Sequence, residues 1–473
     1  MRVLLVEDDP EFVDVFELEL TRPLFDLNVA LSRSSALVAL EESYELVICD
    51  LNIPSDDHGL DTDVAHGMAV LSEVVNTYPG TPIIAFSAYG SVPVLKELLR
   101  QGRHGDYLGV GEQQEMVTFL EKSQLTDCLA RVKQIQIAMA DLADIELSTG
   151  MHSIDLGADD ERTIRIFARR TGGTLVRVTP LGGGLSGSRV LSLRVESSSG
   201  HKATVVAKID EIRKVREERR LVETYVAGAL PPGAFPAMAS IVDAGAGAVG
   251  GLFFQAAGYD DSLLDVVSRD AHKSARAVAT IEAHLARWRD GARIDRATVG
   301  SIRELLAPND KLLPIQEAAV KSDAEAVRVH ARTCIQHCDL HVFNVLVSDA
   351  GDPIVIDFFN LMPAPAALDA VTLELSMLLH EAARDRSGTW PTLEEAQLWA
   401  DVDRYVERCP YPEFVTACRT WAVHAAAGDG EICACAYAYC LRQLRFPGCP
   451  QELARALIAG LAARLLDGAA VTG

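Results

Sequence analysis

Short apolar runs that end on polar side chains alternate with helical patterns over the first quarter of the chain. Because helical stretches separate the runs, they predict a doubly wound parallel sheet over residues 1–124. Such sheets bind ligands at the carboxyl ends of their strands. The predicted strands are "VLLV" (3–6), "YELVICD" (44–50), "TPIIAFSA" (81–88) and "GDYLGV" (105–110). The side chains expected at their ends are Glu7, Asp8, Asp50 and Ser87.

The segment after this sheet predicts a helix. Residues 112–147 carry apolar side chains at intervals of three and four, and the stretch 125–142 has an apolar stripe and no glycine. Two interpretations of that stretch stay open. It is a coiled-coil or dimerisation helix that joins a sensor to an output, or it packs on its own domain. We assign residues 125–155 as a helical connector, and a homodimer through it or through the first domain belongs to the first interpretation.

A lysine interrupts an apolar run in the second half of the chain. Lys208 lies within the predicted strand "ATVVAKID" (203–210), where a buried ammonium group needs an anionic partner. Phosphate oxygens would serve on one side and a glutamate of the next helix on the other. Glu218 is the first choice, with Glu217 and Glu223 nearby. The preceding glycine-rich turn, within 174–196, is by itself more typical of a plain hairpin, although glycines also let backbone N–H groups approach phosphates.

The stretch "QHCDLHVFNVLVSDAGDPIVIDFF" (336–359) has polar side chains at both ends of two apolar runs. Asp339 would accept or orient the proton of a substrate hydroxyl, and Asn344 and Asp357 would hold Mg²⁺ on nucleotide phosphates. His337 is interpreted as structural, bracing the loop by hydrogen bonds. A hairpin with polar ends explains each residue singly, but not a glycine-rich turn, a strand lysine, D-x4-N and a strand-terminal aspartate in this order.

Composition narrows the class of protein. The chain has 473 residues, which suggests about two to four domains, and 49% of them are hydrophobic, which is typical of a globular protein. The N-terminus meets acidic residues at once, unlike a signal peptide, and no apolar run reaches the ~20 residues of a membrane span. The ten cysteines are scattered, which favours reduced thiols and a cytoplasmic location. Cys433, Cys435 and Cys440 are interpreted as packed core, since positions i and i+2 point apart on a helix.

The net charge of −23 is concentrated in the first domain. Residues 1–124 contain 22 acidic and 7 basic residues, which gives −15, and the remaining residues contribute −8. An acidic surface repels phosphate backbones, so nucleic-acid binding is disfavoured.

Carboxylates gathered at the sheet edge repel one another by about 4 kcal/mol per pair at ~4 Å and an effective dielectric constant of ~20, and Mg²⁺ would relieve that repulsion.

Residues 1–124 resemble the receiver domain of two-component response regulators, and "DLNIP" around Asp50 is a close match to that family. The resemblance implies an α/β fold with a doubly wound, five-stranded parallel sheet. It also implies a phosphoacceptor at Asp50, supplied by a histidine kinase or phosphotransfer partner, and a bound Mg²⁺. The implied metal ligands are Glu7, Asp8, Asp50 and the backbone carbonyl of Asn52, and the implied sensors of the phosphoryl group are the hydroxyl of Ser87 and the switching aromatic Tyr107.

Two features depart from the receiver pattern. The family has Lys-Pro beginning three residues after the switching aromatic, whereas Val110 and Gly111 stand there in this chain. Whether Asp50 is phosphorylated is therefore left open. The loop after Pro54, "SDDHGLDTDVAH", is longer than usual. A solvated acidic loop is favoured over a gate or a metal site that uses His58 and His66.

The segment "HCDLHVFNVLV…VIDF" is similar to the H-G-D-L-H-x-x-N motif and following I-D-F/W of the aminoglycoside phosphotransferase and choline kinase superfamily. The resemblance implies an α+β bilobal, protein kinase-like fold, with an N-lobe at 156–258 and a mostly helical C-lobe at 259–473. It makes Asp339 the catalytic aspartate and Asn344 and Asp357 the metal ligands. The implied ATP-binding residues are Gly184, Ser186, Gly187, Ser188, Lys208, Glu218, Gln255 and Ala257, the last two in the hinge "FFQAAG".

A eukaryotic-type protein kinase fits less well. The second metal-binding aspartate lies in "DFF" rather than D-F-G, no A-P-E follows, and Cys338 stands where the superfamily usually has glycine. The sequence therefore predicts a receiver coupled to an ATP- and Mg²⁺-dependent phosphotransferase that acts on a hydroxyl of a small molecule or protein, regulated through Asp50. The alternative is a catalytically weak, nucleotide-binding scaffold with a phosphorylation-independent receiver. No motif identifies the acceptor.

Overall fold

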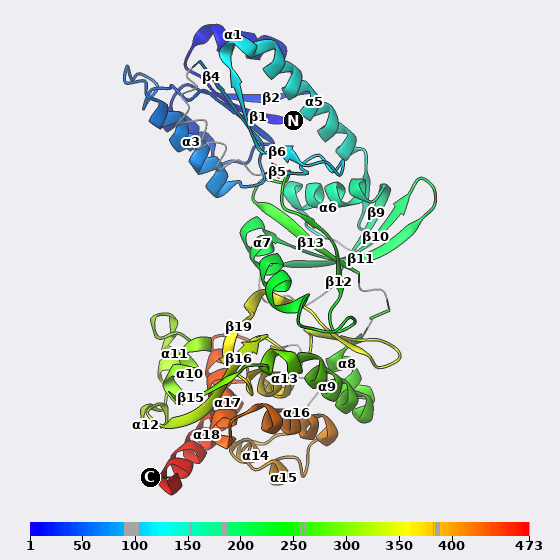
Figure 1. The fold of residues 1–473 in the computed structure, drawn as a ribbon, viewed down its shortest axis with the longest axis vertical. Coiled ribbons are helices and arrows are strands. Elements are labelled where there is room, and N and C mark those ends of the chain that lie inside the picture. The colour runs from blue at the N-terminus through cyan, green and yellow to red at the C-terminus, as the bar shows by residue number, and fades with distance from the viewer. Residues whose placement is uncertain are drawn as a thin grey trace. The chain divides into compact units, whose positions relative to one another are not determined.

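The computed structural model describes residues 1–88, 104–150, 154–181, 188–255, 258, 259, 261–381, 383 and 388–472. The chain divides into two compact units (Figure 1). Unit 1 comprises Met1–Glu217 and Met238–Ala256, and unit 2 comprises Glu218–Ala237 and Ala257–Gly473.

Unit 1 begins with a five-stranded sheet of order β2-β1-β3-β4-β7, in which all neighbouring strands are parallel. Helices α1 and α5 bury apolar side chains against one face, and α2 and α3 against the other. The predicted doubly wound α/β sheet is therefore confirmed. Its elements are β1 (Arg2–Val6), α1 (Pro10–Glu19), β2 (Asp26–Ala30), α2 (Arg33–Ala39), β3 (Leu46–Cys49), α3 (Val64–Thr77), β4 (Ile83–Ser87), β5 (His104–Gly105), β6 (Gln114–Glu115), β7 (Val117–Glu121), η1 (Lys122–Gln124) and α5 (Leu125–Ala143).

The fifth strand of this sheet is β7, and the predicted strand at 105–110 is wrong. β7 pairs with β4 from Ile83↔Val117 to Ser87↔Glu121. Only Gly105 of the predicted segment is in a strand, and it pairs with β6 outside the sheet. The predicted helix over 112–147 is likewise wrong in its first part, because α5 begins at Leu125. Apolar spacing over so short a run does not separate a strand from a helix.

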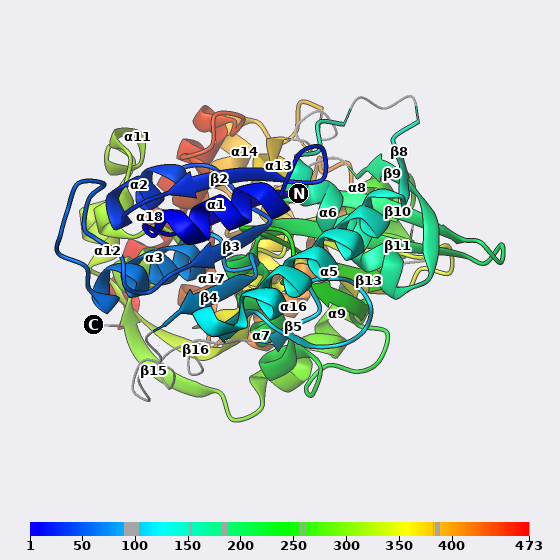
Figure 2. The ribbon, with the colours of Figure 1, turned by 90° about the horizontal axis from the view of Figure 1, so that it is seen from above.

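A six-stranded sheet of order β12-β13-β11-β10-β9-β8 forms the rest of unit 1. Figure 2 shows β9, β10 and β11 side by side. Helix α6 covers this sheet, where the ring of Phe167 stacks on Phe253 with centroids 4.0 Å apart. The elements are β8 (Glu146–Ser148), α6 (Ala158–Arg170), β9 (Gly173–Pro180), β10 (Arg189–Ser197), β11 (Lys202–Glu211), α7 (Ile212–Leu221), η2 (Val222–Val226), β12 (Ala237–Val242) and β13 (Val249–Gln255).

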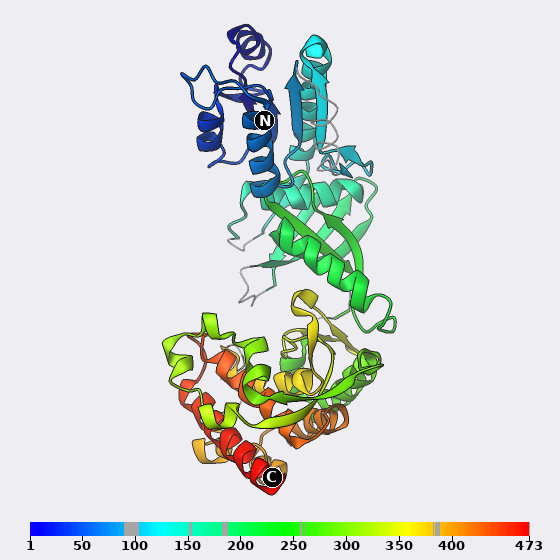
Figure 3. The ribbon, with the colours of Figure 1, turned by 60° about the vertical axis from the view of Figure 1, so that its left-hand side comes forward.

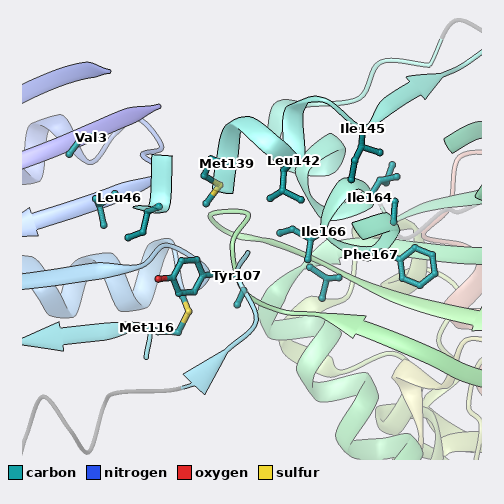
Figure 4. Close-up of a cluster of buried hydrophobic side chains, with 14 of the residues drawn as sticks. Val3, Leu46, Tyr107, Met116, Met139, Leu142, Ile145, Ile164, Ile166 and Phe167 are labelled. Atoms are coloured by element: carbon teal, nitrogen blue, oxygen red, sulfur yellow. The ribbon is translucent and has the colours of Figure 1, made fainter. Parts of the chain in front are cut away.

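One hydrophobic core runs through both sheets of unit 1. Figure 4 shows Met139 and Leu142 of α5 between the first sheet, which carries Leu46, and helix α6, which carries Ile166. The apolar stripe of α5 is buried in this core. A coiled coil would need the same stripe at its surface, so the structure favours the interpretation in which this helix packs on its own domain.

Backbone hydrogen bonds also join the two sheets. Gly80 N–H donates to the carbonyl of Gly247, and Gly245 N–H donates to the carbonyl of Gly80, each at 2.7 Å. Gly245 has φ +93°, and a Cβ there would lie 2.5 Å from the carbonyl oxygen of Tyr107. Only glycine permits both this conformation and this close approach. The first sheet and the second sheet therefore belong to one continuous body.

Unit 2 contains two antiparallel three-stranded sheets, β15-β16-β19 and β14-β17-β18, and a mostly helical C-terminal part, as predicted. Figure 3 shows α17 in orange beside α18 in red. No helix among the described residues is long and apolar enough to cross a membrane. The elements are β14 (Asp261–Ser262), α8 (Leu263–Arg269), α9 (Ala271–Leu285), η3 (Ala286–Arg289), β15 (Arg293–Thr298), α10 (Val299–Leu306), η4 (Asn309–Lys311), α11 (Pro314–Glu317), α12 (Ser322–Glu325), β16 (Arg328–Gln336), β17 (Val345–Val347), β18 (Pro353–Val355), η5 (Phe358–Asn360), β19 (Met362–Pro365), α13 (Leu368–Leu379), α14 (Leu393–Gln397), α15 (Val402–Tyr405), α16 (Pro412–Ala425), α17 (Asp429–Gln443) and α18 (Gln451–Thr472).

Candidate functional site

The acidic side chains predicted at the carboxyl edge of the first sheet lie close together. Ligand oxygens of Glu7, Asp8 and Asp50 are all within 4.8 Å of one another. Asn52 N–H donates to Oδ1 of Asp50 at 3.1 Å, which fixes the turn after β3. Ser87 is fully buried at the end of β4, the strand next to β3. The edge thus has the arrangement that the parallel topology predicts.

The chemistry of this group of carboxylates fits a divalent cation. Glu7 is fully buried, and its Oε2 has no hydrogen-bond partner within the described part of the chain. Burial raises the pKa of Glu7 to about 7 even though Lys122 opposes the shift, and burial also raises the pKa of Asp8. A cation such as Mg²⁺ would satisfy Oε2 and favour the ionised carboxylates, because it prefers a few carboxylate ligands together with water.

Lys122 is a site residue that the sequence analysis missed. Its Nζ lies 2.8 Å from Oε1 of Glu7 and 2.7 Å from Oδ2 of Asp50. The analysis looked for this lysine three residues after Tyr107 and found Val110. In the structure Lys122 directly follows β7 and stands three residues after Phe119. The family spacing is therefore present, and the run "VTFLE" followed by lysine was its signal.

Tyr107 lies outside the five-stranded sheet, so the premise of its assignment as the switching aromatic is wrong. It is 1% exposed, and its hydroxyl accepts a hydrogen bond from Nη2 of Arg131 on α5 at 2.9 Å. Burial raises the pKa of Tyr107. Phe119 is the aromatic on β7, at the position three residues before the lysine.

Asp106 joins the receiver to α6 and β12. It is 3% exposed and accepts a hydrogen bond from Nε of Arg170 at 2.7 Å, and its carbonyl accepts one from Nη2 of the same residue at 2.9 Å. Nη1 of Arg170 also donates to the carbonyl of Ile241. The N–H groups of Val110 and Gly111 each donate to the Asp106 carboxylate at 2.9 Å. The segment taken for a strand is thus the junction between the two sheets.

The long acidic loop after Pro54 is stabilised by its own contacts. Nδ1 of His66 lies 3.0 Å from the carbonyl of Ile53. Oδ1 of Asp61 accepts hydrogen bonds from the N–H and the hydroxyl of Ser55. Among the residues that the structure describes, neither His58 nor His66 belongs to a group that could hold a metal ion. The cysteines at 433, 435 and 440 are buried on α17, as a packed core requires.

In unit 2, the loop after β16 is held by a buried aspartate. Both carboxylate oxygens of Asp369, on α13, accept backbone hydrogen bonds, from His337 at 2.7 Å and from Cys338 at 2.9 Å. Nε2 of His337 lies 3.0 Å from the carbonyl of Ile356. Cys338 has φ +61°, in the left-handed region that favours glycine. That conformation accounts for the glycine of the superfamily motif at this position.

The hairpin β17–β18 brings the two predicted metal ligands of unit 2 together. Ile356 N–H donates to the carbonyl of Asn344 at 3.0 Å, so Asn344 lies opposite the residue that precedes Asp357. Nδ2 of Asn344 donates to the carbonyl of Asp339 at 2.9 Å. The amide oxygen is then the atom that a cation would meet. An amide oxygen and a carboxylate are both ligands that Mg²⁺ accepts.

Asp339 is fixed through both carboxylate oxygens. Oδ1 accepts a hydrogen bond from Nη2 of Arg442 at 2.9 Å, and Oδ2 accepts one from Nδ2 of Asn360 at 3.3 Å. Burial alone would raise the pKa of Asp339, but Arg442 and the nearby rings of His341 and His337 lower it below its usual range. The carboxylate is therefore ionised. Arg442 stands far away in the sequence, on α17, and no motif marks it.

The residues predicted to bind the nucleotide phosphates have different surroundings. Lys208 is buried on β11, between Val190 of β10 and Leu252 of β13. The hydroxyl of Ser188 donates to Oδ2 of Asp210 at 2.7 Å. Gln255 ends β13 and is exposed. The predicted residues Gly184, Ser186, Gly187 and Ala257 lie outside the described residues.

The two glutamates considered as partners of Lys208 differ in burial. Glu218 is 3% exposed, and its Oε1 accepts a hydrogen bond from the N–H of Phe358, directly after Asp357, at 3.2 Å. Glu223 is exposed and pairs with Arg219 at 2.7 Å. Glu218 thus lies beside the predicted metal ligand within unit 2. The pairing of Glu218 with Lys208 stays a prediction.

Comparisons with known protein families identify both parts of the chain. The family model of the response regulator receiver domain matches residues 3–108. That match ends at residue 108, before β7. The residues around Asp106, which lie at the junction between the two sheets, interrupt the receiver pattern there. The model of the phosphotransferase enzyme family matches residues 177–401. The chain therefore contains a response regulator receiver domain followed by a domain of the phosphotransferase enzyme family.

Individual relatives cover parts of the chain. The transcriptional regulatory protein GlrR of Escherichia coli K12 is 33% identical over 101 residues, which is 21% of this chain and 21% of the relative. The response regulator protein FleR of Pseudomonas aeruginosa is 34% identical over 108 residues, 23% of this chain and 21% of the relative. The chain thus spans about a fifth of the length of these relatives.

Solved structures are similar to each part. A receiver domain protein (CheY-like) of Methanospirillum hungatei is 19% identical with a TM-score of 0.23, and the match covers 30% of this chain and 97% of that one. A thermostable mutant of aminoglycoside phosphotransferase APH(4)-Ia is 16% identical with a TM-score of 0.34, and the match covers 62% of this chain and 94% of that one.

Proposed function

We propose that this chain transfers the γ-phosphoryl group of ATP to an alcohol group, and that phosphorylation of Asp50 regulates the transfer. The observation that carries the proposal is the arrangement of residues 337–357 in unit 2. There a loop held by Asp369 presents Asp339, and the following hairpin sets Asn344 beside the end of the strand that leads to Asp357. The match to the phosphotransferase enzyme family supports it.

The proposed transfer is a single displacement at phosphorus. The acceptor hydroxyl oxygen forms a bond to the γ-phosphorus, and the bond from that phosphorus to the β,γ-bridging oxygen breaks. ADP leaves with the electron pair of that bond, and the hydroxyl proton passes to Oδ2 of Asp339 and from there to water. Such transfers depend mostly on positioning and on charge neutralisation, which agrees with a carboxylate held at both oxygens.

The remaining residues bind and orient the nucleotide in this proposal. Asn344 and Asp357 would hold Mg²⁺, which would neutralise charge on the β- and γ-phosphates. Lys208 would contact the phosphates, a role that rests on the superfamily resemblance and on its burial within an apolar sheet. Glu218 hydrogen-bonds the N–H of Phe358 and so holds the backbone next to Asp357.

The acceptor screen is the direct test of the proposed function. The full chain is incubated with γ-labelled ATP and Mg²⁺ and with separate panels of hydroxyl-bearing sugars, aminocyclitols, amino alcohols and Ser/Thr peptides. We expect transfer of label to one panel and loss of that transfer when EDTA removes Mg²⁺. Binding of ATP without transfer to any panel or to water would contradict the proposal and favour the nucleotide-binding scaffold.

The regulatory half of the proposal has a structural basis in unit 1. Lys122 contacts Asp50 and leads through η1 into α5, whose buried face belongs to the core shared with α6. A phosphoryl group on Asp50 would compete for the ammonium group of Lys122. Because the receiver and the second sheet share one core, a shift of α5 would reach α6 without a linker.

Acetyl phosphate should phosphorylate this receiver despite the valine at 110. Lys122 is placed to neutralise the incoming phosphoryl group, so we expect Mg²⁺-dependent incorporation of one phosphate, detected by intact-mass spectrometry. Asp50→Asn should abolish the incorporation, and Lys122→Ala should slow it by about 10²-fold. Asp56→Asn, in the exposed loop, is the matched control. Incorporation that persists in Asp50→Asn would show that Asp50 is not the acceptor.

A further inference from the structure

The guanidinium group of Arg442 contacts two consecutive residues of the loop that carries Asp339. Nη1 donates to the carbonyl of Cys338 at 2.9 Å, and Nη2 donates to Oδ1 of Asp339 at 2.9 Å. The side chains of Arg442 and Asp339 are 16% and 23% exposed, so the pair is largely shielded from water. Hydrogen bonds between two charged groups in such surroundings are stronger and geometrically more restrictive than bonds at an open surface.

The helix that supplies Arg442 is tied down at both ends. Near its start, the buried carboxylate of Glu431 accepts backbone hydrogen bonds from Arg332 of β16 at 2.8 Å and from Ala367 at 3.1 Å. At its other end, Nε2 of Gln316 donates to the carbonyl of Leu441 at 2.8 Å. The residue before Arg442 is thus fixed to a different helix. A side chain on so constrained a backbone is suited to hold another residue in place.

We propose that Arg442 is a positioning residue for Asp339 in phosphoryl transfer. It holds Oδ1 and the preceding carbonyl, while Asn344 holds the carbonyl of Asp339 itself at 2.9 Å. Among the described residues, Oδ2 has only the longer bond from Asn360, at 3.3 Å, which an acceptor hydroxyl can replace. Oδ2 is therefore the oxygen that faces the acceptor. This inference rests on the proposed function, since it assigns Arg442 a part in that reaction.

The planar geometry of the guanidinium group is as important for holding Asp339 as its positive charge. Two N–H groups in one plane reach two acceptors on adjacent residues and so fix both the position and the rotation of the carboxylate. An ammonium group at the same place would supply the charge but not the paired geometry. Arg442→Lys should therefore recover part of the function that Arg442→Gln loses. Arg445→Gln is the matched control, because Arg445 follows the end of α17, is exposed, and has its guanidinium group over the ring of Phe446.

The first measurement separates binding from transfer in the full chain. For Arg442→Gln we expect the rate of phosphoryl transfer, to the acceptor from the screen or to water, to fall by about 10²-fold, because a misoriented carboxylate costs about that much. The Kd for Mg·ATP, measured by calorimetry, should stay within about twofold, since Arg442 touches neither predicted metal ligand. The transfer rate of Arg442→Lys should lie between that of Arg442→Gln and that of the unaltered protein. Arg445→Gln should match the unaltered protein in both the transfer rate and the Kd.

The second measurement needs no activity. Amide hydrogen exchange of the loop 337–344 should become about tenfold faster in Arg442→Gln and stay unchanged in Arg445→Gln. Equal rates and equal exchange in the two variants would overturn the proposal, and so would faster exchange throughout β16 and α17, which would make Arg442 a general structural tie. If the unaltered protein transfers no phosphoryl group, the proposed function fails, and the exchange alone then decides whether Arg442 fixes the loop.

Discussion

We expect Asp339→Asn to lower the rate of the proposed phosphoryl transfer by about 10³-fold, within the range found when a positioned general base is removed. Asparagine has the same size, and its amide oxygen can still accept the hydrogen bond that Oδ1 takes from Arg442. It cannot take up the acceptor proton. The loss is therefore chemical rather than structural. The transfer rate at saturating ATP and acceptor measures it.

The nucleotide site should survive this substitution. Asp339 contacts Asn344 through its backbone carbonyl, which the substitution does not alter. The Kd for Mg·ATP should thus remain within about twofold of the unaltered protein. Asp349→Asn is the matched control, because it makes the same chemical change at an exposed position in the turn between β17 and β18. A transfer rate that falls equally in both variants, or a Kd that rises as much as the rate falls, would remove Asp339 from the catalytic role.

The proximity of Glu7, Asp8 and Asp50 could be predicted from the sequence, because it depends only on where parallel strands end. Parallel strands end at one edge, so acids that follow β1 and β3 meet there whatever the helices between them do. Asn344 and Asp357 were assigned from the order of polar residues and from the superfamily motif, and the pairing of β17 with β18 explains why the two residues lie close together.

The last strand of the receiver was missed for a physical reason. Residues 105–109, which lie between β4 and β7, pack on α6 and on the β12–β13 turn rather than in the five-stranded sheet. The run "GDYLGV" is apolar because it is buried at that junction, and burial there resembles the burial of a strand. The lysine was sought at the wrong place, although Lys122 keeps the spacing from Phe119.

The contact of Arg442 with Asp339 and the core shared by the two sheets could not be predicted from the sequence, for a different reason. The contact of Arg442 with Asp339 joins residues 103 positions apart, and a single sequence carries no sign of such a pairing. The stripe on α5 was visible, but its partner was not, because an apolar stripe looks the same whether a second chain or α6 covers it. Only the structure shows that α6 does.

The shared core predicts that the receiver and the second sheet unfold as one cooperative unit, and that Arg170→Met destabilises both. The substitution leaves the buried carboxylate of Asp106 without its ionic partner, which costs about 3 kcal/mol, at the low end for a broken buried pair because two backbone N–H groups remain. Arg177→Met is the matched control. Its pair with Glu196 lies at the surface, where the Arg177 guanidinium group is exposed, and such pairs contribute little to stability.

The two units can be followed separately during urea unfolding. All four tryptophans lie in unit 2, so tryptophan fluorescence reports that unit, whereas hydrogen exchange against urea resolves peptides of unit 1. Peptides from β3 and from β11 should open with the same free energy, and Arg170→Met should lower both values equally while the fluorescence midpoint stays in place. Opening of β3 at lower urea than β11 would mean that the receiver is a separate domain. Its phosphorylation would then have to act on the phosphotransferase domain through some other contact than this core.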